Sequence, residues 1–87
     1  MASYRVEVKP SARKELERLS NPVIARIIRR LETLVHNARP PGCKKLKGGD
    51  REWRLRVGDY RVVYTVDDQK LLVEVTRIRH RSQVYER

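Results

Sequence analysis

The sequence predicts an α+β domain in which a helical hairpin packs on one face of a small, mainly antiparallel sheet of four strands. Two periodicities support this prediction. Apolar and polar residues alternate over four short segments, which is typical of half-buried strands, and apolar residues recur every three or four positions over two segments, which is typical of helices. The predicted order is strand, helix, helix and then three strands. At 87 residues the chain is expected to form one domain spanning residues 1–87.

The first strand is predicted over residues 4–9, and the first helix is expected to begin at Pro10 and Ser11, with Ser11 as the N-cap. Apolar residues on one side of this strand are Tyr4, Val6 and Val8. Apolar residues at helical spacing in the helix are Ala12, Leu16 and Leu19.

A second helix is expected to begin at Asn21, which would cap it, with Pro22 in the first turn, where its missing N–H costs nothing. Its apolar stripe is the clearest periodic feature of the chain and consists of Ile24, Ile27, Ile28, Leu31, Leu34 and Val35. The connection to the first helix is so short that the two helices should form an antiparallel hairpin.

The second helix ends before Pro40-Pro41-Gly42, and residues 44–50 are expected to continue as a basic, glycine-containing loop. This loop matches no phosphate-binding pattern. A solvated loop is the favoured interpretation, with nucleic-acid contact as the alternative.

Gly58-Asp59 predicts a two-residue hairpin turn between strands at residues 52–57 and 60–66, and a final strand follows over residues 71–78. If these two residues are the whole turn, Arg56 lies opposite Arg61. The residues that would then face the helices are Trp53, Leu55, Val57, Tyr60, Val62 and Tyr64.

The formal charge of +10 arises from 21 Lys and Arg against 11 Asp and Glu. Such an excess attracts polyanions, so nucleic acid, the ribosome and an acidic protein are the natural partners. A basic surface that serves only solubility is the alternative. A membrane surface is disfavoured because no amphipathic helix rich in Trp and Phe is present.

Few residues are suited to metal or redox chemistry. Cys43 is the only cysteine, and His36 and His80 do not have the spacing of a zinc site, so neither a metal nor a cofactor is expected. No apolar run is long enough for a signal peptide or a membrane span, so we expect a cytoplasmic protein.

Three arginines would share the face of the hairpin turned away from the helices: Arg54, Arg56 and Arg61. Like charges directly opposite one another destabilise a sheet. A ligand with negative charge, such as a phosphodiester, explains their placement. The alternative is a splayed, solvated arginine face that is eased by Glu74 on the next strand.

The C-terminal segment combines cations with a titratable ring and a stacking ring: Arg77, Arg79, His80, Arg81 and Tyr85. This combination suits single-stranded RNA, which proteins bind by stacking and by backbone contacts. The alternative is a basic tail whose Val84 and Tyr85 dock on the sheet.

Residues 39–42, 45–48, 53–64 and 80–85 together resemble the RelE/ParE toxin superfamily. The most specific part is Gly58-Asp59-Tyr60-Arg61-Val62-Val63-Tyr64, and the order of elements agrees. The closing Arg81 and Tyr85 place the resemblance nearer to RelE than to ParE.

The resemblance to RelE implies a ribosome-dependent endoribonuclease that cuts messenger RNA in the decoding site, leaving a 2′,3′-cyclic phosphate and a 5′-hydroxyl. It implies that Arg61 binds the scissile phosphate, Arg81 assists the leaving group, and Tyr85 stacks on a base or accepts the 2′ proton. His80, with an ordinary pKa of about 6.5, would exchange protons more easily, although a structural histidine at a strand end is the alternative. Residues expected to bind RNA are Arg54, Arg56, Lys45, Lys47, Arg77 and Arg79.

Arg54 and Arg56 stand where the best-studied member of the superfamily has lysines. This difference keeps the charge but removes groups whose pKa is easily lowered.

The resemblance also implies a RelB-like antitoxin partner, with an amphipathic helix and an acidic or hydrophobic segment that covers the sheet and its arginines. Ribosome and messenger RNA are the other expected partners, whereas a membrane is not expected. Two alternatives stay open. One is a ParE-like inhibitor of DNA gyrase without chemistry of its own, and the other is a non-catalytic, basic RNA-binding domain.

Overall fold

The computed structural model describes residues 3–46 and 51–83. Its elements are β1 (Arg5–Val8), α1 (Pro10–Glu17), α2 (Asn21–Leu34), β2 (Lys44–Lys45), β3 (Glu52–Val57), β4 (Tyr60–Asp67), β5 (Leu72–His80) and the short 3-10 helix η1 (Arg81–Gln83). This is the predicted order, with one short strand added.

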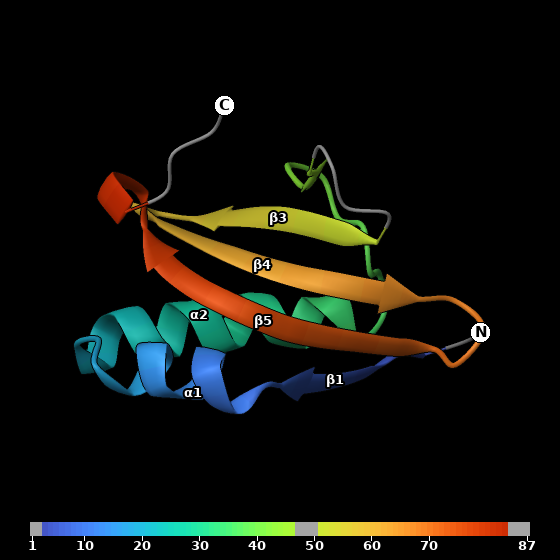
Figure 1. Ribbon diagram of the computed structural model, residues 1–87, viewed down its shortest axis with the longest axis horizontal. Coiled ribbons are helices and arrows are strands. Elements are labelled where there is room, and N and C mark those ends of the chain that lie inside the picture. The colour runs from blue at the N-terminus through green and yellow to red at the C-terminus, as the bar shows by residue number, and fades with distance from the viewer. Residues whose placement is uncertain (1–2, 47–50, 84–87) are drawn as a thin grey trace.

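The strands form a 5-stranded sheet in the order β1-β5-β4-β3-β2, in which β1 runs parallel to β5 and the other neighbours are antiparallel (Figure 1). The prediction of four strands missed β2, which was expected to be part of a loop. Lys44 and Lys45 lie opposite Arg54 and Trp53, and so cover the free edge of β3. An edge strand this short and this charged does not invite further strand pairing.

Both predicted N-caps were wrong by one or two positions. Lys9 occupies the N-cap of α1 and Ser20 that of α2, and neither side chain caps its helix. Each helix has a proline in its first turn, as predicted for Pro22, and this sets the backbone for helix entry without a capping side chain. The Ser11 hydroxyl instead donates a hydrogen bond to the Thr76 carbonyl oxygen of β5, at 3.4 Å.

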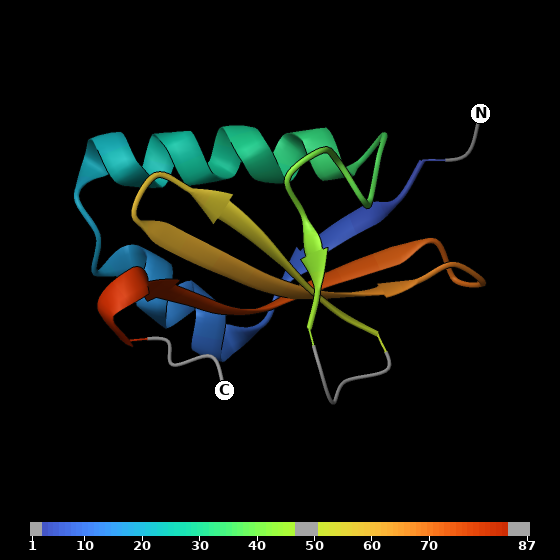
Figure 2. The ribbon, with the colours of Figure 1, turned by 90° about the horizontal axis from the view of Figure 1, so that it is seen from above.

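The two helices pack on the sheet at different places. α2 covers one face of the sheet, as Figure 2 shows, and buries Ile27, Leu31 and Leu34 there. α1 packs against β5 and buries Ala12 and Leu16. The rest of the core consists of Ala38, which follows α2, and of eight residues of the sheet: Leu55, Val57, Val62, Tyr64, Val66, Val73, Val75 and Ile78. The opposite face of the sheet, here called the open face, is the one that α2 does not cover.

The β3–β4 hairpin has the predicted register: Val57 lies opposite Tyr60 and Arg56 opposite Arg61. Gly58 has a φ of +59°, a conformation that glycine adopts without strain, so the two-residue turn is confirmed. The fully buried Tyr64 donates a hydrogen bond to the Ala38 carbonyl oxygen at 2.8 Å, which connects the hairpin to the loop that follows α2.

A β-bulge interrupts the pairing of β4 with β5. Val63 lies opposite Arg77, but the next residue, Tyr64, lies opposite Val75, so Thr76 is the extra residue. The Thr76 hydroxyl donates to the Val63 carbonyl oxygen at 3.3 Å. Beyond the bulge the alternation of β5 is shifted by one residue, and this shift turns Arg77 and Arg79 to the open face.

Within the described residues, no helix is long and apolar enough to cross a membrane.

Candidate nucleic-acid interface

The open face carries two neighbouring rows of cations that run across the strands. Arg56, Arg61 and Arg79 form the row next to the β3–β4 turn, on β3, β4 and β5. The next row has three cations, Lys44 on β2, Arg54 on β3 and Arg77 on β5, with the apolar Val63 of β4 between the two arginines. We call these two rows the arginine face. The structure therefore brings the three predicted hairpin arginines together with Arg77, Arg79 and Lys44, which was not predicted to take part.

Arg54 is a partly buried residue of the arginine face. Its pKa is lowered, first by partial burial and then by the positive charges of Arg61 and Arg56. The Arg54 guanidinium stays charged at neutral pH in spite of such a shift. Burial is the larger cause of this shift and the neighbouring positive charges are the smaller one, and a bound phosphate would oppose the effect of those charges.

The acidic residues of the open face lie outside the arginine face, in the rows farther from the β3–β4 turn. Glu52 lies opposite Thr65 on β4, and Thr65 lies opposite Glu74 on β5. Glu74 forms an ion pair with Lys9, at 3.6 Å. The alternative in which Glu74 eases the hairpin arginines therefore has little structural basis, because Glu74 is two rows away from Arg61.

Glu15 of α1 is a site residue that the sequence analysis missed. Its carboxylate accepts a hydrogen bond from the Ile78 backbone N–H at 2.8 Å and another from Arg79 Nε at 3.0 Å. β1 pairs with β5 only as far as Val75, so α1 takes over the edge of β5 where β1 has ended. Glu15 thereby satisfies an edge N–H and holds the Arg79 guanidinium in place.

Arg81 follows β5 directly and lies beside the β3–β4 turn. Its backbone N–H donates to the Asp59 carbonyl oxygen at 2.7 Å, and its Nε lies 3.8 Å from Asp59 Oδ1 in a solvent-exposed ion pair. This contact brings Arg81 to the end of the hairpin that carries Arg61, although twenty positions separate them in the sequence. The convergence of Arg61 and Arg81 on one phosphate stays a prediction.

His80 lies on the other face of the sheet. It is the cross-strand partner of Tyr60, whose ring it meets edge to face at 5.2 Å between ring centres. Its Nδ1 accepts a hydrogen bond from the Ser82 backbone N–H at 3.2 Å and lies 2.8 Å from the Ser82 hydroxyl. This position separates His80 from the arginine face, so its role in proton transfer remains a prediction that this geometry does not favour.

The remaining predicted site residues divide into two groups. Lys45 lies opposite Trp53, on the side of the sheet that faces the helices, and not with the arginines. Lys47 and Tyr85 lie outside the described residues. Among the described residues, no group of three or more His, Cys, Asp or Glu side chains could hold a metal ion.

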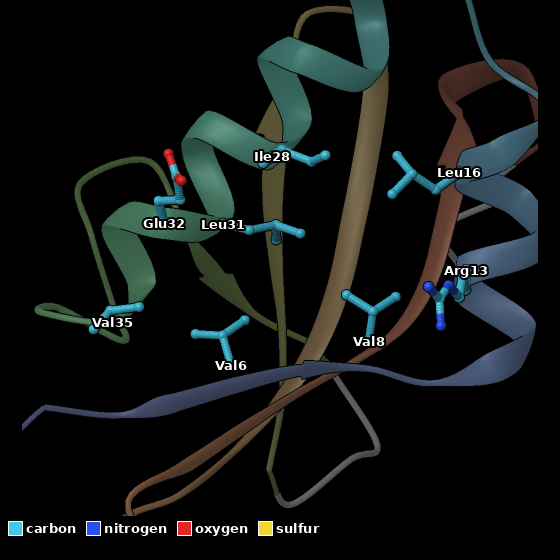
Figure 3. Close-up of a pocket in the computed structure, with 8 residues that line it drawn as sticks. All are labelled: Val6, Val8, Arg13, Leu16, Ile28, Leu31, Glu32 and Val35. Carbon is cyan, nitrogen blue, oxygen red and sulfur yellow. The ribbon is translucent and has the colours of Figure 1, made fainter. Parts of the chain in front are cut away.

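An apolar groove lies between α1 and α2, over β1 (Figure 3). Its volume is about 460 Å³, and its lining residues are Val6, Val8, Arg13, Leu16, Ile28, Leu31, Glu32 and Val35. Ile28 is a large apolar side chain with 44% of its surface exposed. Arg13 and Glu32 are the only charged residues among the lining residues that the structure describes.

A family model described as the ParE toxin of type II toxin-antitoxin systems, parDE, matches residues 6–85. The chain belongs to the RelE/ParE toxin superfamily. This toxin is 29% identical over 85 residues to a putative toxin RelE1 of Methanocaldococcus jannaschii, and the match covers 94% of each chain.

Solved structures of this superfamily share the fold of the toxin. The RelE–RelB complex of Pyrococcus horikoshii matches with a TM-score of 0.83 at 25% identity, covering 94% of this chain and 99% of the other. The RelBE2 toxin–antitoxin complex of Mycobacterium tuberculosis matches with a TM-score of 0.79 at 25% identity, covering 90% and 98%. The predicted superfamily and fold class are thereby confirmed.

Proposed function

We propose that this toxin is a RelE-like endoribonuclease that cuts messenger RNA on the ribosome. The observation that carries the proposal is the arginine face, on which five arginines and Lys44 occupy two adjacent rows of a sheet face that α2 leaves uncovered. Such a surface binds a phosphodiester backbone. The similarity to RelE toxins supports the choice of RNA as the ligand.

The proposed reaction is an attack by the ribose 2′-oxygen on the adjacent 3′ phosphorus. The bond from phosphorus to the 5′-oxygen breaks, a base removes the 2′ proton, and the 5′-oxygen takes up a proton. Negative charge grows on the phosphoryl oxygens in the transition state, and fixed cations at that point lower the barrier. Arg61, on the central strand and between Arg56 and Arg79, is the residue we assign to the scissile phosphate.

Arg81 is assigned to the leaving 5′-oxygen because it lies at the hairpin end where Arg61 is located. Guanidinium groups, with pKa values above about 12, stabilise charge much better than they transfer protons. Tyr85 is therefore retained as the residue that accepts the 2′ proton or stacks on a base. Ribosome-bound messenger would supply the remaining geometry, since orientation alone can provide much of the rate.

We further propose that the amphipathic helix of a RelB-like antitoxin occupies the apolar groove between α1 and α2, while its acidic or hydrophobic segment covers the arginine face. Structures of related toxins contain RelB partners. The groove fits one amphipathic helix, because its floor is apolar and its rim carries one cation and one carboxylate, Arg13 and Glu32. Replacing Ile28 by Glu is expected to leave toxicity intact while it weakens neutralisation by the antitoxin.

The competing function is inhibition of DNA gyrase, which the match to the ParE family model favours. One experiment separates the two functions: brief induction of the toxin in cells, with mapping of new RNA 5′ ends and measurement of plasmid supercoiling in the same samples. New 5′ ends within translated messages, with normal supercoiling, are the expected result. Altered supercoiling without new ends would favour the gyrase function instead.

A further inference from the structure

We propose that the toxin has a second RNA-binding pocket, which takes one nucleotide of a single strand at the end of the sheet remote from the β3–β4 turn. The pocket has a volume of about 310 Å³, and its lining residues are Arg39, Lys45, Arg51, Trp53, Val66, Asp67, Asp68 and Gln69. Trp53 and Val66 of the pocket lie on the helix-covered side of the sheet, with Leu55 and Tyr64, and Asp67 is the last residue of β4. The arginine face is on the other side.

A rigid stacking surface forms one wall of this pocket. The Arg39 guanidinium carbon lies 5.1 Å from the centre of the Trp53 ring. Asp68 holds that guanidinium through two hydrogen bonds, of 2.8 and 3.2 Å, and Asp68 also accepts a hydrogen bond from the Tyr4 hydroxyl at 2.7 Å. Nucleobases stack on aromatic rings and on guanidinium planes, and a plane that is already fixed loses little entropy on binding.

The polar groups of the pocket are mixed in a way that fits a nucleotide better than a bare anion. Arg39 forms an ion pair with Asp68 at 2.8 Å and Arg51 one with Asp67 at 3.4 Å, so Lys45 is the remaining cation of the pocket, and the two carboxylates would repel a simple anion. A nucleotide offers a phosphate to Lys45 and base N–H groups to the carboxylate oxygens. Lys45 forms no ion pair within residues 3–46 and 51–83, so its ammonium group is available for a phosphate.

The two-residue strand β2 connects this pocket to the arginine face. Lys44 lies in a row of the arginine face, opposite Arg54, and the next residue, Lys45, points to the pocket side, opposite Trp53. A single RNA strand can therefore pass from the arginine face over the β2 edge into the pocket. The inference rests on the proposed function, because it assigns the same class of ligand to both surfaces.

Trp53 is the only tryptophan of the chain, so its fluorescence reports directly on the pocket. The probe is a short single-stranded oligoribonucleotide with 2′-O-methyl riboses, which cannot react by 2′-hydroxyl attack. We expect a saturable change of Trp53 emission that weakens with salt. Lys45→Ala should weaken this binding several-fold and reduce its salt dependence by about one phosphate contact. The matched control is Lys14→Ala, which removes an exposed lysine of α1 and should change nothing.

Two outcomes would overturn the pocket. One is binding that Lys45→Ala leaves unchanged and Arg61→Ala abolishes, since the oligonucleotide would then occupy only the arginine face. The other outcome is that inorganic phosphate displaces the oligonucleotide as effectively as a nucleoside monophosphate does. This result would indicate a simple anion site. Cleavage of ribosome-bound messenger is measured separately. Cleavage without a Trp53 response rejects the pocket alone, whereas a response without cleavage supports the pocket and contradicts the nuclease function.

Discussion

Arg56 and Arg61 lie directly opposite each other across the β3–β4 hairpin, on the open face of the sheet, and Arg79 extends the same row onto β5. Like charges in this position destabilise a sheet, in a fold whose total stability is typically only about 5–15 kcal/mol. An arrangement that costs stability and concentrates positive charge is expected where the fold must bind an anion. This is the physical basis on which we assign the arginine face to RNA.

Replacing Arg56 by Thr tests that assignment. Threonine suits a strand and removes the repulsion with Arg61, so the free energy of unfolding should stay the same or increase, while the rate of RNA cleavage falls. Urea denaturation and a cleavage assay measure the two effects. Arg5→Thr is the matched control, because Arg5 is an exposed strand arginine far from the arginine face and beside Glu7. A clear loss of stability in Arg56→Thr would show that Arg56 has a structural role.

Glu15 should stabilise the end of β5. Replacing it with Ala leaves the Ile78 N–H and the Arg79 guanidinium without their acceptor, which we expect to reduce the free energy of unfolding by about 1–3 kcal/mol. Glu17→Ala on the same helix is the control, since Glu17 makes only an exposed pair with Arg13 at 3.8 Å, and such pairs contribute at most about 1 kcal/mol. Equal effects of the two substitutions would contradict the role of Glu15.

Leu31 and Ile28 are neighbours on the apolar stripe of α2 but differ in burial, at 6% and 44% exposed. Leu31→Ala should reduce the free energy of unfolding by about 2–5 kcal/mol because it leaves a cavity in the core. Ile28→Ala should cost at most about 1 kcal/mol, since its side chain is already partly in water. Denaturant titration of both variants measures the difference, and a Leu31→Ala curve identical to that of the parent would place Leu31 outside the core.

The Asp68 carboxylate should make the stability of the fold depend on pH in the acidic range. Hydrogen bonds from Arg39 and then from Tyr4 lower the pKa of Asp68 below its ordinary value of 3.8. A carboxyl whose pKa is lower in the folded state contributes stability above pH 3.8, and that contribution is lost as the pH falls through the lower, folded-state value. Melting temperature measured from neutral pH to pH 2 should therefore fall less steeply for Asp68→Asn than for the parent. Parallel curves would reject this contribution.

Much of the fold could be predicted because local patterns determine it. The alternation around Gly58-Asp59 predicted the hairpin register correctly. It therefore also predicted that Arg54, Arg56 and Arg61 share one face. The helical stripes identified all the buried apolar residues of α1 and α2, but they also included Ile28, which is 44% exposed. The N-caps were predicted wrongly because proline in the first turn can start a helix without a capping side chain.

The site residues that could not be predicted are positioned by contacts between segments far apart in the sequence. No local pattern indicates that Glu15 reaches β5, or that two lysines pair with the edge of β3. The bulge at Thr76 did have a signal in the sequence: Val73 and Val75 alternate, but the next core residue is Ile78, which is one position late. A bulge explains that shift, and it is the bulge that adds Arg77 and Arg79 to the arginine face.

The most direct test is the rate at which the purified toxin cleaves messenger RNA bound to ribosomes, compared between the parent and Arg61→Ala, with ribosome sedimentation of both proteins as the control. We expect Arg61→Ala to slow cleavage by about 10²–10³, the usual effect of removing one group that stabilises transition-state charge. We also expect nearly unchanged sedimentation, because the remaining surface stays strongly basic. Cleavage by Arg61→Ala at the parent's rate would contradict the account.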